Sequence, residues 1–184
     1  MRFLLIYATV EGQTRKIAAH IADRLSGAGH DITLMDAADV KAAPPADSFD
    51  AIIATAPVHV SSFPLPFRQF TKHNAQTLMA RPGAFVSVSL TAASDDKSEL
   101  AEIDTIVEKF SAETGWWPVS IHHAAGALKY TEYDFFRRWM LKRIAAKEGG
   151  PTDTSRDHEF TDWAALDTFV DGFARQAPDL AGKI

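Results

Sequence analysis

The sequence predicts an α/β fold: an open sheet of five parallel strands with helices on both faces. Three observations predict it. Short apolar runs alternate along the chain with segments of helical periodicity, one run is apolar almost throughout, and 46% of the 184 residues are hydrophobic against 23% charged. Strands that alternate with helices pair in parallel, because each helix returns the chain across the sheet before the next strand begins.

The first predicted unit is a strand followed by a helix. Residues 3–8 form a short apolar run. Residues 14–25 then place Ile17, Ile21 and Leu25 at steps of four, which is the spacing of a helix that buries one face. The chain therefore opens with a strand, a loop and a helix.

The next unit continues this alternation. Residues 31–35 alternate in polarity and predict a second strand. Residues 51–56 form an almost continuous apolar run, which is typical of a strand buried on both faces. Residues 66–78 predict a helix with Phe67 and Phe70 directed inward.

The second half of the chain supplies the remaining strands and two more helices. Residues 84–90 predict the fourth strand and residues 119–124 the fifth. The last helix begins at Thr161 or Asp162, either of which can cap it. Both helices carry an apolar stripe, formed by Leu100, Ile103, Val107 and Phe110 in the first and by Trp163, Leu166, Val170 and Phe173 in the second.

The region from about 126 to 160 interrupts the alternation. It is too long for an ordinary connection, and it has a predicted helix of its own over about 133–147, which residues 149–151 end. No long linker divides the chain. We therefore expect a single domain over residues 1–184 that carries an insert after the fifth strand.

Composition and charge exclude several classes of function. The chain has no cysteine, which excludes thiol catalysis, thiolate metal sites and disulfides. A net charge of -5 argues against a nucleic-acid-binding protein. The N-terminus lacks the pattern of a signal peptide, and no run is long enough to span a membrane. We expect a cytoplasmic protein that at most touches the membrane as a peripheral protein.

The loop between the first strand and the first helix has the features of an anion site. The start of a helix offers unpaired backbone N–H groups, a glycine allows close approach, and threonines add hydroxyl donors. The loop has neither the lysine of a nucleoside-triphosphate loop nor the three glycines of a dinucleotide turn, so it suits a phosphate monoester. Alternatively, Thr14 only caps the helix and Gly12 only turns the chain. The loop consists of Thr9, Val10, Glu11, Gly12, Gln13 and Thr14.

These residues resemble the phosphate loop of the flavodoxin family, which binds FMN, except that Glu11 stands where the family usually has a hydroxyl residue. The whole chain is similar to a branch of that family, the quinone-dependent, oxygen-independent protoporphyrinogen oxidases. That similarity rests on residues 7–14, on Ala-Gly-Ala-Leu-Lys-Tyr at 125–130, on Asp134 with the basic, aromatic stretch through Met140 and Lys142, on Gly-Gly-Pro-Thr-Asp-Thr at 149–154, and on Phe-Thr-Asp-Trp at 160–163.

The resemblance implies a flavodoxin-like sheet in the order 2-1-3-4-5, with FMN at the carboxyl ends of the strands. Ligands of open sheets bind where the strand order reverses, which agrees with this placement. The resemblance adds two loops to the predicted cofactor site. They contribute Pro57, Val58 and His59 after the third strand, and Leu90, Thr91, Ala92 and Ser94 after the fourth.

Some residues of those two loops have an alternative interpretation that involves no cofactor. The family commonly stacks an aromatic residue on the flavin ring, but this chain has Val60 near that position, flanked by His59 and Phe63. His59 is either a flavin contact or an exposed histidine. Thr91 and Ser94 either line the site or cap the following helix.

Two adjacent histidines near the end of the fifth strand do not form a metal site. Neighbouring strand residues point to opposite faces, so His122 and His123 cannot both bind one ion, and no carboxylate lies at a suitable spacing. We predict no metal.

The predicted helix of the insert is basic and aromatic. It either packs against the rest of the protein, or it contacts substrate or an anionic membrane surface, because a porphyrinogen bears two propionates and a lipid quinone lives in the bilayer. The residues that we assign to this contact are Arg137, Arg138, Trp139, Lys142 and Arg143.

The predicted function is the FMN-dependent oxidation of protoporphyrinogen IX to protoporphyrin IX, a step of haem biosynthesis, with a membrane quinone as the electron acceptor. No catalytic acid or base is assigned. One alternative is an electron-transfer flavodoxin or a flavin-dependent quinone reductase. The other is a flavodoxin-like interaction module without FMN, which Glu11 and the missing ring-stacking aromatic keep open.

Overall fold

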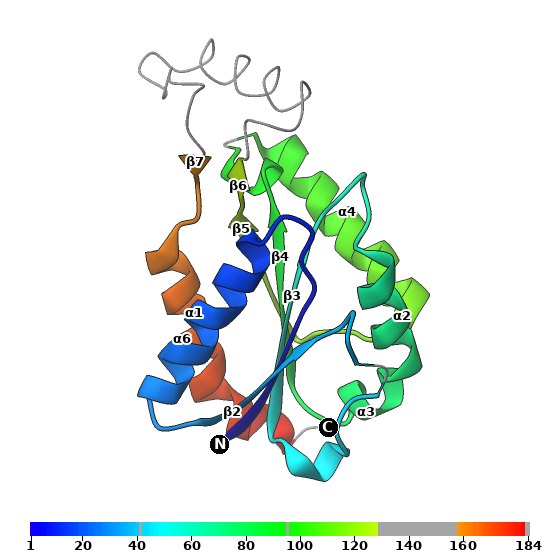
Figure 1. The fold of residues 1–184 in the computed structure, drawn as a ribbon, viewed down its shortest axis with the longest axis vertical. Helices are drawn as coiled ribbons and strands as arrows, with labels where there is room; N and C mark the ends of the chain where they lie inside the picture. Colours follow the sequence, from blue (N-terminus) through cyan, green and yellow to red (C-terminus); the bar gives the residue numbers. More distant parts are fainter. Residues whose placement is uncertain (41, 95, 129–157, 183–184) are drawn as a thin grey trace.

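The computed structural model describes residues 1–40, 42–94, 96–128 and 158–182. Its centre is a five-stranded sheet in which every neighbouring pair is parallel (Figure 1). The strand order is β2-β1-β3-β4-β5, as predicted. The strands are β1 (Arg2–Tyr7), β2 (Asp31–Asp36), β3 (Ala51–Pro57), β4 (Gly83–Ser89) and β5 (Ser120–Ala125).

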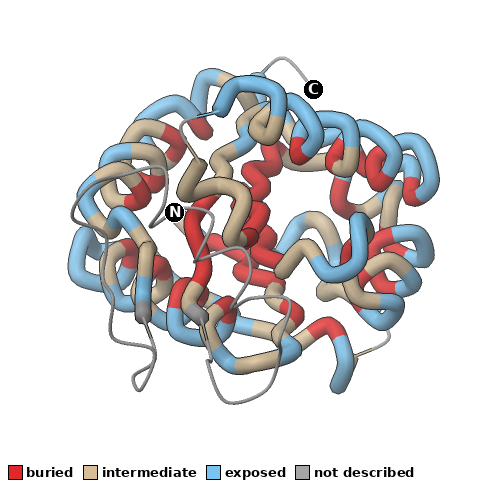
Figure 2. Tube along the Cα trace, turned by 90° about the horizontal axis from the view of Figure 1, so that it is seen from above, coloured by how far each residue is buried: buried red, intermediate tan, exposed pale blue. Residues whose placement is uncertain are grey.

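Helices cover both faces of the sheet, which gives three layers (Figure 1). On one face lie α1 (Gln13–Gly27) and α6 (Trp163–Ala181); on the other lie α2 (Leu65–His73), α3 (Ala75–Met79) and α4 (Lys97–Thr114). Buried residues gather along the strands and on the inward sides of the helices, as Figure 2 shows in red. No helix in the described part of the chain is long and apolar enough to cross a bilayer.

Two separate cores hold the layers together. Beneath α1 and α6, aliphatic residues such as Ile17, Ile21 and Val170 pack on the sheet. Beneath α2 and α4 the core is aromatic, and the rings of Phe67, Phe85 and Phe110 stack with centroids 5.2–5.8 Å apart. The apolar spacing in the sequence thus identified the inward faces of α1, α2, α4 and α6.

The predicted helix over residues 66–78 is wrong in one respect, because the chain forms two helices there. The break lies at Asn74, which ends α2 and begins α3. Its side-chain amide donates to the carbonyl of Phe70 at 2.8 Å, and its Oδ1 accepts from the backbone N–H of Ala43 at 2.8 Å. The hydrogen bond to Ala43, 31 residues earlier in the chain, therefore favours the break at Asn74 over a continuous helix.

A short two-stranded ribbon follows β5. Its strands, β6 (Ala127–Leu128) and β7 (His158–Glu159), pair antiparallel and bracket the predicted insert. We call residues 126–128 and 158–161 the stem. The predicted helix over 133–147 lies outside the described residues, as do Arg137, Arg138, Trp139, Lys142 and Arg143.

A polar seam joins α1 to α6. Arg24 forms a forked pair with Asp171 at 2.6 and 2.8 Å and also reaches Asp167, which bonds His20 at 2.7 Å. The hydrogen bond from Arg24 lowers the pKa of Asp171, although partial burial opposes the shift. Arg2 lowers the pKa of Asp50 in the same way.

These lowered pKa values predict acid sensitivity. A carboxyl whose pKa is lower in the folded state stabilises the fold above its unfolded pKa, about 3.9 for Asp, and loses that contribution as pH falls through its folded pKa. We expect the free energy of unfolding, measured with urea, to fall as the pH drops below about 4. Arg24→Gln should reduce that dependence, and an unchanged pH profile in this variant would contradict the assignment.

Candidate functional site

The candidate site lies at the carboxyl edge of the sheet, where the strand order reverses between β1 and β3. Three loops meet at this edge: one before α1, one after β3 and one after β4. All three predicted segments of the cofactor site, 9–14, 57–59 and 90–94, are therefore at the same end of the molecule. The topology alone brings them there, because parallel strands all end at one edge.

The first turn of α1 leaves its backbone N–H groups open. Its N-cap is Gly12, which has φ 95° and no side chain to cap the helix. The N–H of Gly12 donates to Thr9 Oγ1 at 2.9 Å, which shapes the loop. By contrast, Asp96 caps α4 and Asp162 caps α6. The start of α1 can therefore receive an anion, and the interpretation of Thr14 as its cap is wrong.

Two buried hydroxyl groups lie at the same end of the α1 face. Thr14 is 2% exposed and Thr55 is 1% exposed. Thr55 Oγ1 has no hydrogen-bond partner among the described residues. By strand alternation Thr55 shares its face with Ile53, which packs in the core beneath α1. Open N–H groups and hydroxyls without a loop cation fit the phosphate monoester of FMN.

Glu11 is the one member of this loop that opposes an anion. Glu11 is partly exposed beside the start of α1, where its carboxylate would repel a bound phosphate. We predict that Glu11→Thr raises the affinity for FMN several-fold, because it removes the repulsion and adds a hydroxyl donor. Quenching of flavin fluorescence measures the affinity, and riboflavin, which lacks the phosphate, is the control ligand. Equal gains for both flavins would place Glu11 away from the phosphate.

The loop after β3 ends in a tight hairpin turn. His59 and Ser62 exchange backbone hydrogen bonds of 2.7 and 3.1 Å, and the two residues between them, Val60 and Ser61, have φ values of 49° and 55°. Two positive φ angles are the pattern of a type I′ turn, which favours Asn-Gly. Val60 is 85% exposed at its tip. This loop therefore has two unfavourable backbone conformations next to the candidate cofactor site.

That strain predicts a stabilising substitution. Ser61→Gly should raise the free energy of unfolding by about 1 kcal/mol, because glycine adopts positive φ without a steric penalty. Ser62→Gly is the matched control and should not stabilise, since residue 62 does not itself have a positive φ. Urea unfolding of both variants compares them, and equal stabilities would contradict the prediction.

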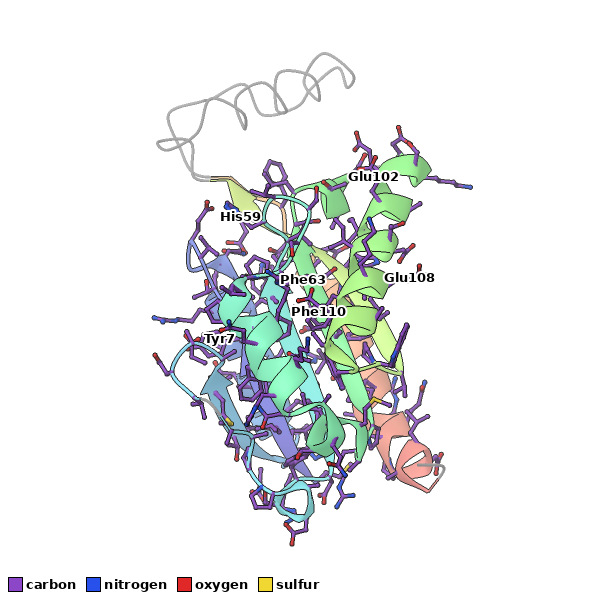
Figure 3. All side chains as sticks on the ribbon, turned by 90° about the vertical axis from the view of Figure 1, so that its right-hand side faces the viewer. Tyr7, His59, Phe63, Glu102, Glu108 and Phe110 are labelled. Atoms are coloured by element: carbon purple, nitrogen blue, oxygen red, sulfur yellow. The ribbon has the colours of Figure 1, made fainter. Side chains whose placement is uncertain are left out.

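Phe63 is not free to stack on a flavin. It is 3% exposed and meets Phe85 and Phe110 edge to face, with ring centroids 5.1 and 5.0 Å apart. Figure 3 shows Phe63 beneath the loop, near Phe110, with His59 farther toward the end of the molecule. His59, Val60 and Ser61 are the exposed residues of this loop, and His59 and Val60 have the larger side chains that could face a bound ring.

The loop after β4 is a 3₁₀ turn over Thr91–Ala93. The N–H of Ala92 donates to Ser89 Oγ at 3.1 Å, and that of Ser94 donates to the carbonyl of Thr91 at 2.9 Å. The interpretation of Thr91 and Ser94 as helix caps is wrong, since Asp96 caps α4. Their assignment to the cofactor site stays a prediction.

The histidines of β5 point to opposite faces, as predicted. His122 stacks on Phe169 of α6 with centroids 5.1 Å apart, and burial lowers its pKa. His123 Nε2 lies 2.9 Å from Asp104 of α4, and its Nδ1 lies 2.6 Å from the buried Ser87 Oγ. Because the carboxylate accepts from Nε2–H, Nδ1 of the neutral ring accepts from the hydroxyl of Ser87. Among the described residues no group of three metal-binding side chains occurs.

Sequence reasoning missed two features of this site. Thr55 interrupts an apolar run near the carboxyl end of its strand, which was the available signal. Lys16 was not singled out, and nothing in its local pattern indicated its partner Glu159, 143 residues away.

Comparisons with known proteins agree with this architecture. The flavodoxin domain family matches residues 4–155. Protoporphyrinogen IX dehydrogenase (quinone) of Escherichia coli strain K12 is 31% identical over 183 residues, which are 100% of this chain and 98% of that protein. The Leishmania major protein with the same name is 33% identical over 174 residues, 93% of this chain and 74% of its own.

The fold is also found among solved structures. A short-chain flavodoxin associated with a non-canonical PDU bacterial microcompartment aligns over 96% of this chain and 99% of its own, with a TM-score of 0.56 and 16% identity. At that identity the likeness concerns the fold alone.

Proposed function

The chain belongs to the flavodoxin domain family, whose cofactor is FMN, and from this premise we propose that it oxidises protoporphyrinogen IX to protoporphyrin IX with a quinone as electron acceptor. The observation that supports FMN as the cofactor is the uncapped start of α1 beside the buried Thr14 and Thr55. The substrate and acceptor rest on the names of relatives that align over 93–100% of this chain.

The loop before α1 would hold the phosphate of the cofactor. The N–H groups at the start of the helix point outward without intrahelical acceptors, and a phosphate there gains hydrogen bonds and the favourable end of the helix dipole. Thr9 already accepts from Gly12, so its own hydroxyl proton stays available to donate. Thr14 would add a second hydroxyl from within the turn.

The other two loops would flank the ring. Pro57, Val58 and His59 approach from β3, and the turn over Thr91–Ala93 approaches from β4. The N–H of Val58 donates to the carbonyl of Val88 at 2.8 Å, which ties the first of these loops to the strand that leads into the second. Val60 would cover the ring with aliphatic carbon where relatives of this fold commonly use an aromatic residue.

The proposed reaction removes six electrons and six protons from the substrate, which together reduce three quinones to quinols. Bound FMN supplies the two-electron redox chemistry, which the side chains of this cysteine-free chain lack. The chain contributes binding and orientation, and His59 is exposed beside the proposed ring site.

The decisive experiment mixes the FMN-loaded protein anaerobically with protoporphyrinogen IX and a soluble quinone. Porphyrin fluorescence that appears at a rate proportional to enzyme, and only with quinone, is the expected result. Flavin absorbance without porphyrin would favour an electron carrier or a reductase with another substrate. A protein that binds no flavin would overturn the proposal in favour of an interaction module.

A further inference from the structure

The first turn of α1 makes contacts in two directions. Its backbone N–H groups face the loop over residues 9–12, whereas two of its side chains, three residues apart, reach the stem. Gln13 Nε2 donates to Thr161 Oγ1 at 3.0 Å, and Lys16 Nζ pairs with Glu159 at 2.5 Å. In Figure 1, β6 and β7 lie at the same end of the molecule as the start of α1.

The stem is also bonded to the ends of β4 and β5. The N–H of Gly126 donates to the carbonyl of Ser89 at 3.1 Å, and Thr161 Oγ1 donates to the carbonyl of Ala125 at 2.7 Å. Within the stem, the N–H of Phe160 donates to the carbonyl of Gly126 at 3.1 Å. The hydroxyl of Thr161 thus accepts from α1 and donates to the end of β5. This chain of bonds links the stem to the first turn of α1 as well as to the end of β5.

Other contacts also hold α1 against α6. Arg24 and Asp171, two turns farther along, already join the two helices, and an aliphatic core lies beneath them. Lys16 also lies 5.3 Å from the ring centre of Trp163. Burial raises the pKa of Glu159, but the hydrogen bond and the charge of Lys16, together with hydrogen bonds from Gln13 and Trp163, outweigh it and hold that pKa below its ordinary value. The ion pair is therefore formed at neutral pH.

An anion at the start of α1 would order the same turn that holds the stem. The first N–H groups of a helix lack intrahelical partners, and helix ends open most easily. A bound phosphate would fix this turn and with it the side chains of Gln13 and Lys16. Coupling between two sites is reciprocal, so an ordered stem must favour phosphate binding by the same factor.

We propose that Gln13 and Lys16 are positioning residues through which phosphate binding at residues 9–14 stabilises the stem. This inference rests on the proposed function in one respect, which is that FMN is the ligand. It goes beyond that function because it assigns to these side chains a coupling role that neither the redox reaction nor cofactor binding by itself requires.

Hydrogen exchange at the amide of Phe160 tests the proposal, because that N–H bonds within the stem. We expect saturating FMN to slow its exchange at least fivefold, and saturating riboflavin, which lacks the phosphate, to leave it nearly unchanged. In Lys16→Met the effect of FMN should be largely lost. Arg15→Met is the matched control: it removes a charge from the same turn, but Arg15 lies toward Asp36, 3.8 Å away, and it should keep the wild-type effect.

Reciprocity adds a second readout. Lys16→Met should weaken FMN binding by a factor no larger than the slowing that FMN causes in the wild type, and it should leave riboflavin binding unchanged. Equal slowing by both flavins, or equal slowing in Lys16→Met and Arg15→Met, would overturn the inference. Flavin absorbance in the same samples separates the two proposals: no bound flavin overturns both, whereas bound flavin without slower exchange overturns the coupling alone.

Discussion

Phe63→Ala is expected to lower the free energy of unfolding by about 3 kcal/mol, at the low end of the range for buried phenylalanines because the nearby loop can collapse into the cavity. The ring is almost fully buried and touches both Phe85 and Phe110 edge to face. Its loss also detaches the hairpin turn from the aromatic core, so FMN binding should weaken as well. Urea unfolding of the apoprotein and a flavin titration measure the two effects.

Two further variants test this account of Phe63. Phe63→Leu retains most of the apolar volume and should lose less than about 1.5 kcal/mol. Leu65→Ala removes a neighbouring apolar side chain that is 55% exposed, and it should change stability by less than about 0.5 kcal/mol. If Phe63→Ala unfolds at the same urea concentration as Leu65→Ala, the ring does not anchor the loop.

Thr14→Val should weaken FMN binding by about 1–3 kcal/mol, or about five- to 150-fold in the dissociation constant. Valine keeps the shape of the buried side chain but removes its hydroxyl, so an anion at the start of α1 would lose one donor. Quenching of flavin fluorescence measures the dissociation constant, and urea unfolding checks that the variant keeps its stability.

Riboflavin is the control for Thr14→Val, because it presents the same ring without the phosphate. Its affinity should be the same in the variant and the wild type. A loss that is equal for both flavins would show that Thr14 acts through the general packing of the loop. Unchanged FMN affinity would remove Thr14 from the site.

The strands and most of the helices could be predicted because their signals are local. Ile17, Ile21 and Leu25 are buried on one face of α1 as their spacing predicted, and β3 is buried on both sides as its apolar run predicted. The location of the candidate site was predicted from the first loop and from the resemblance to the flavodoxin family, which implied the strand order. Residue type and spacing within a short stretch of chain are enough to predict a strand, a helix and the face that the helix buries.

Other features depended on partners far away in the sequence. The helix break at Asn74 requires Ala43, and the outward end of the β3 loop is set by the burial of Phe63 among rings from β4 and α4. The sequence places Phe63 near the residue expected to stack on the flavin ring. Its position in the sequence does not reveal that its side chain is buried in the aromatic core.

The sequence by itself determined the fold class, most of the strand and helix positions and the loop that has the features of an anion site, because hydrophobic periodicity and glycine placement act locally. Only the tertiary structure showed that a buried hydroxyl lies near this loop and that side chains in the first turn of α1 bond to the stem. The buried hydroxyl of Thr55, which has no partner among the described residues, and the bonds of Gln13 and Lys16 to the stem follow from the packing of segments that are distant in the sequence. Such contacts leave no periodic trace in the chain, since each depends on a single pair of residues.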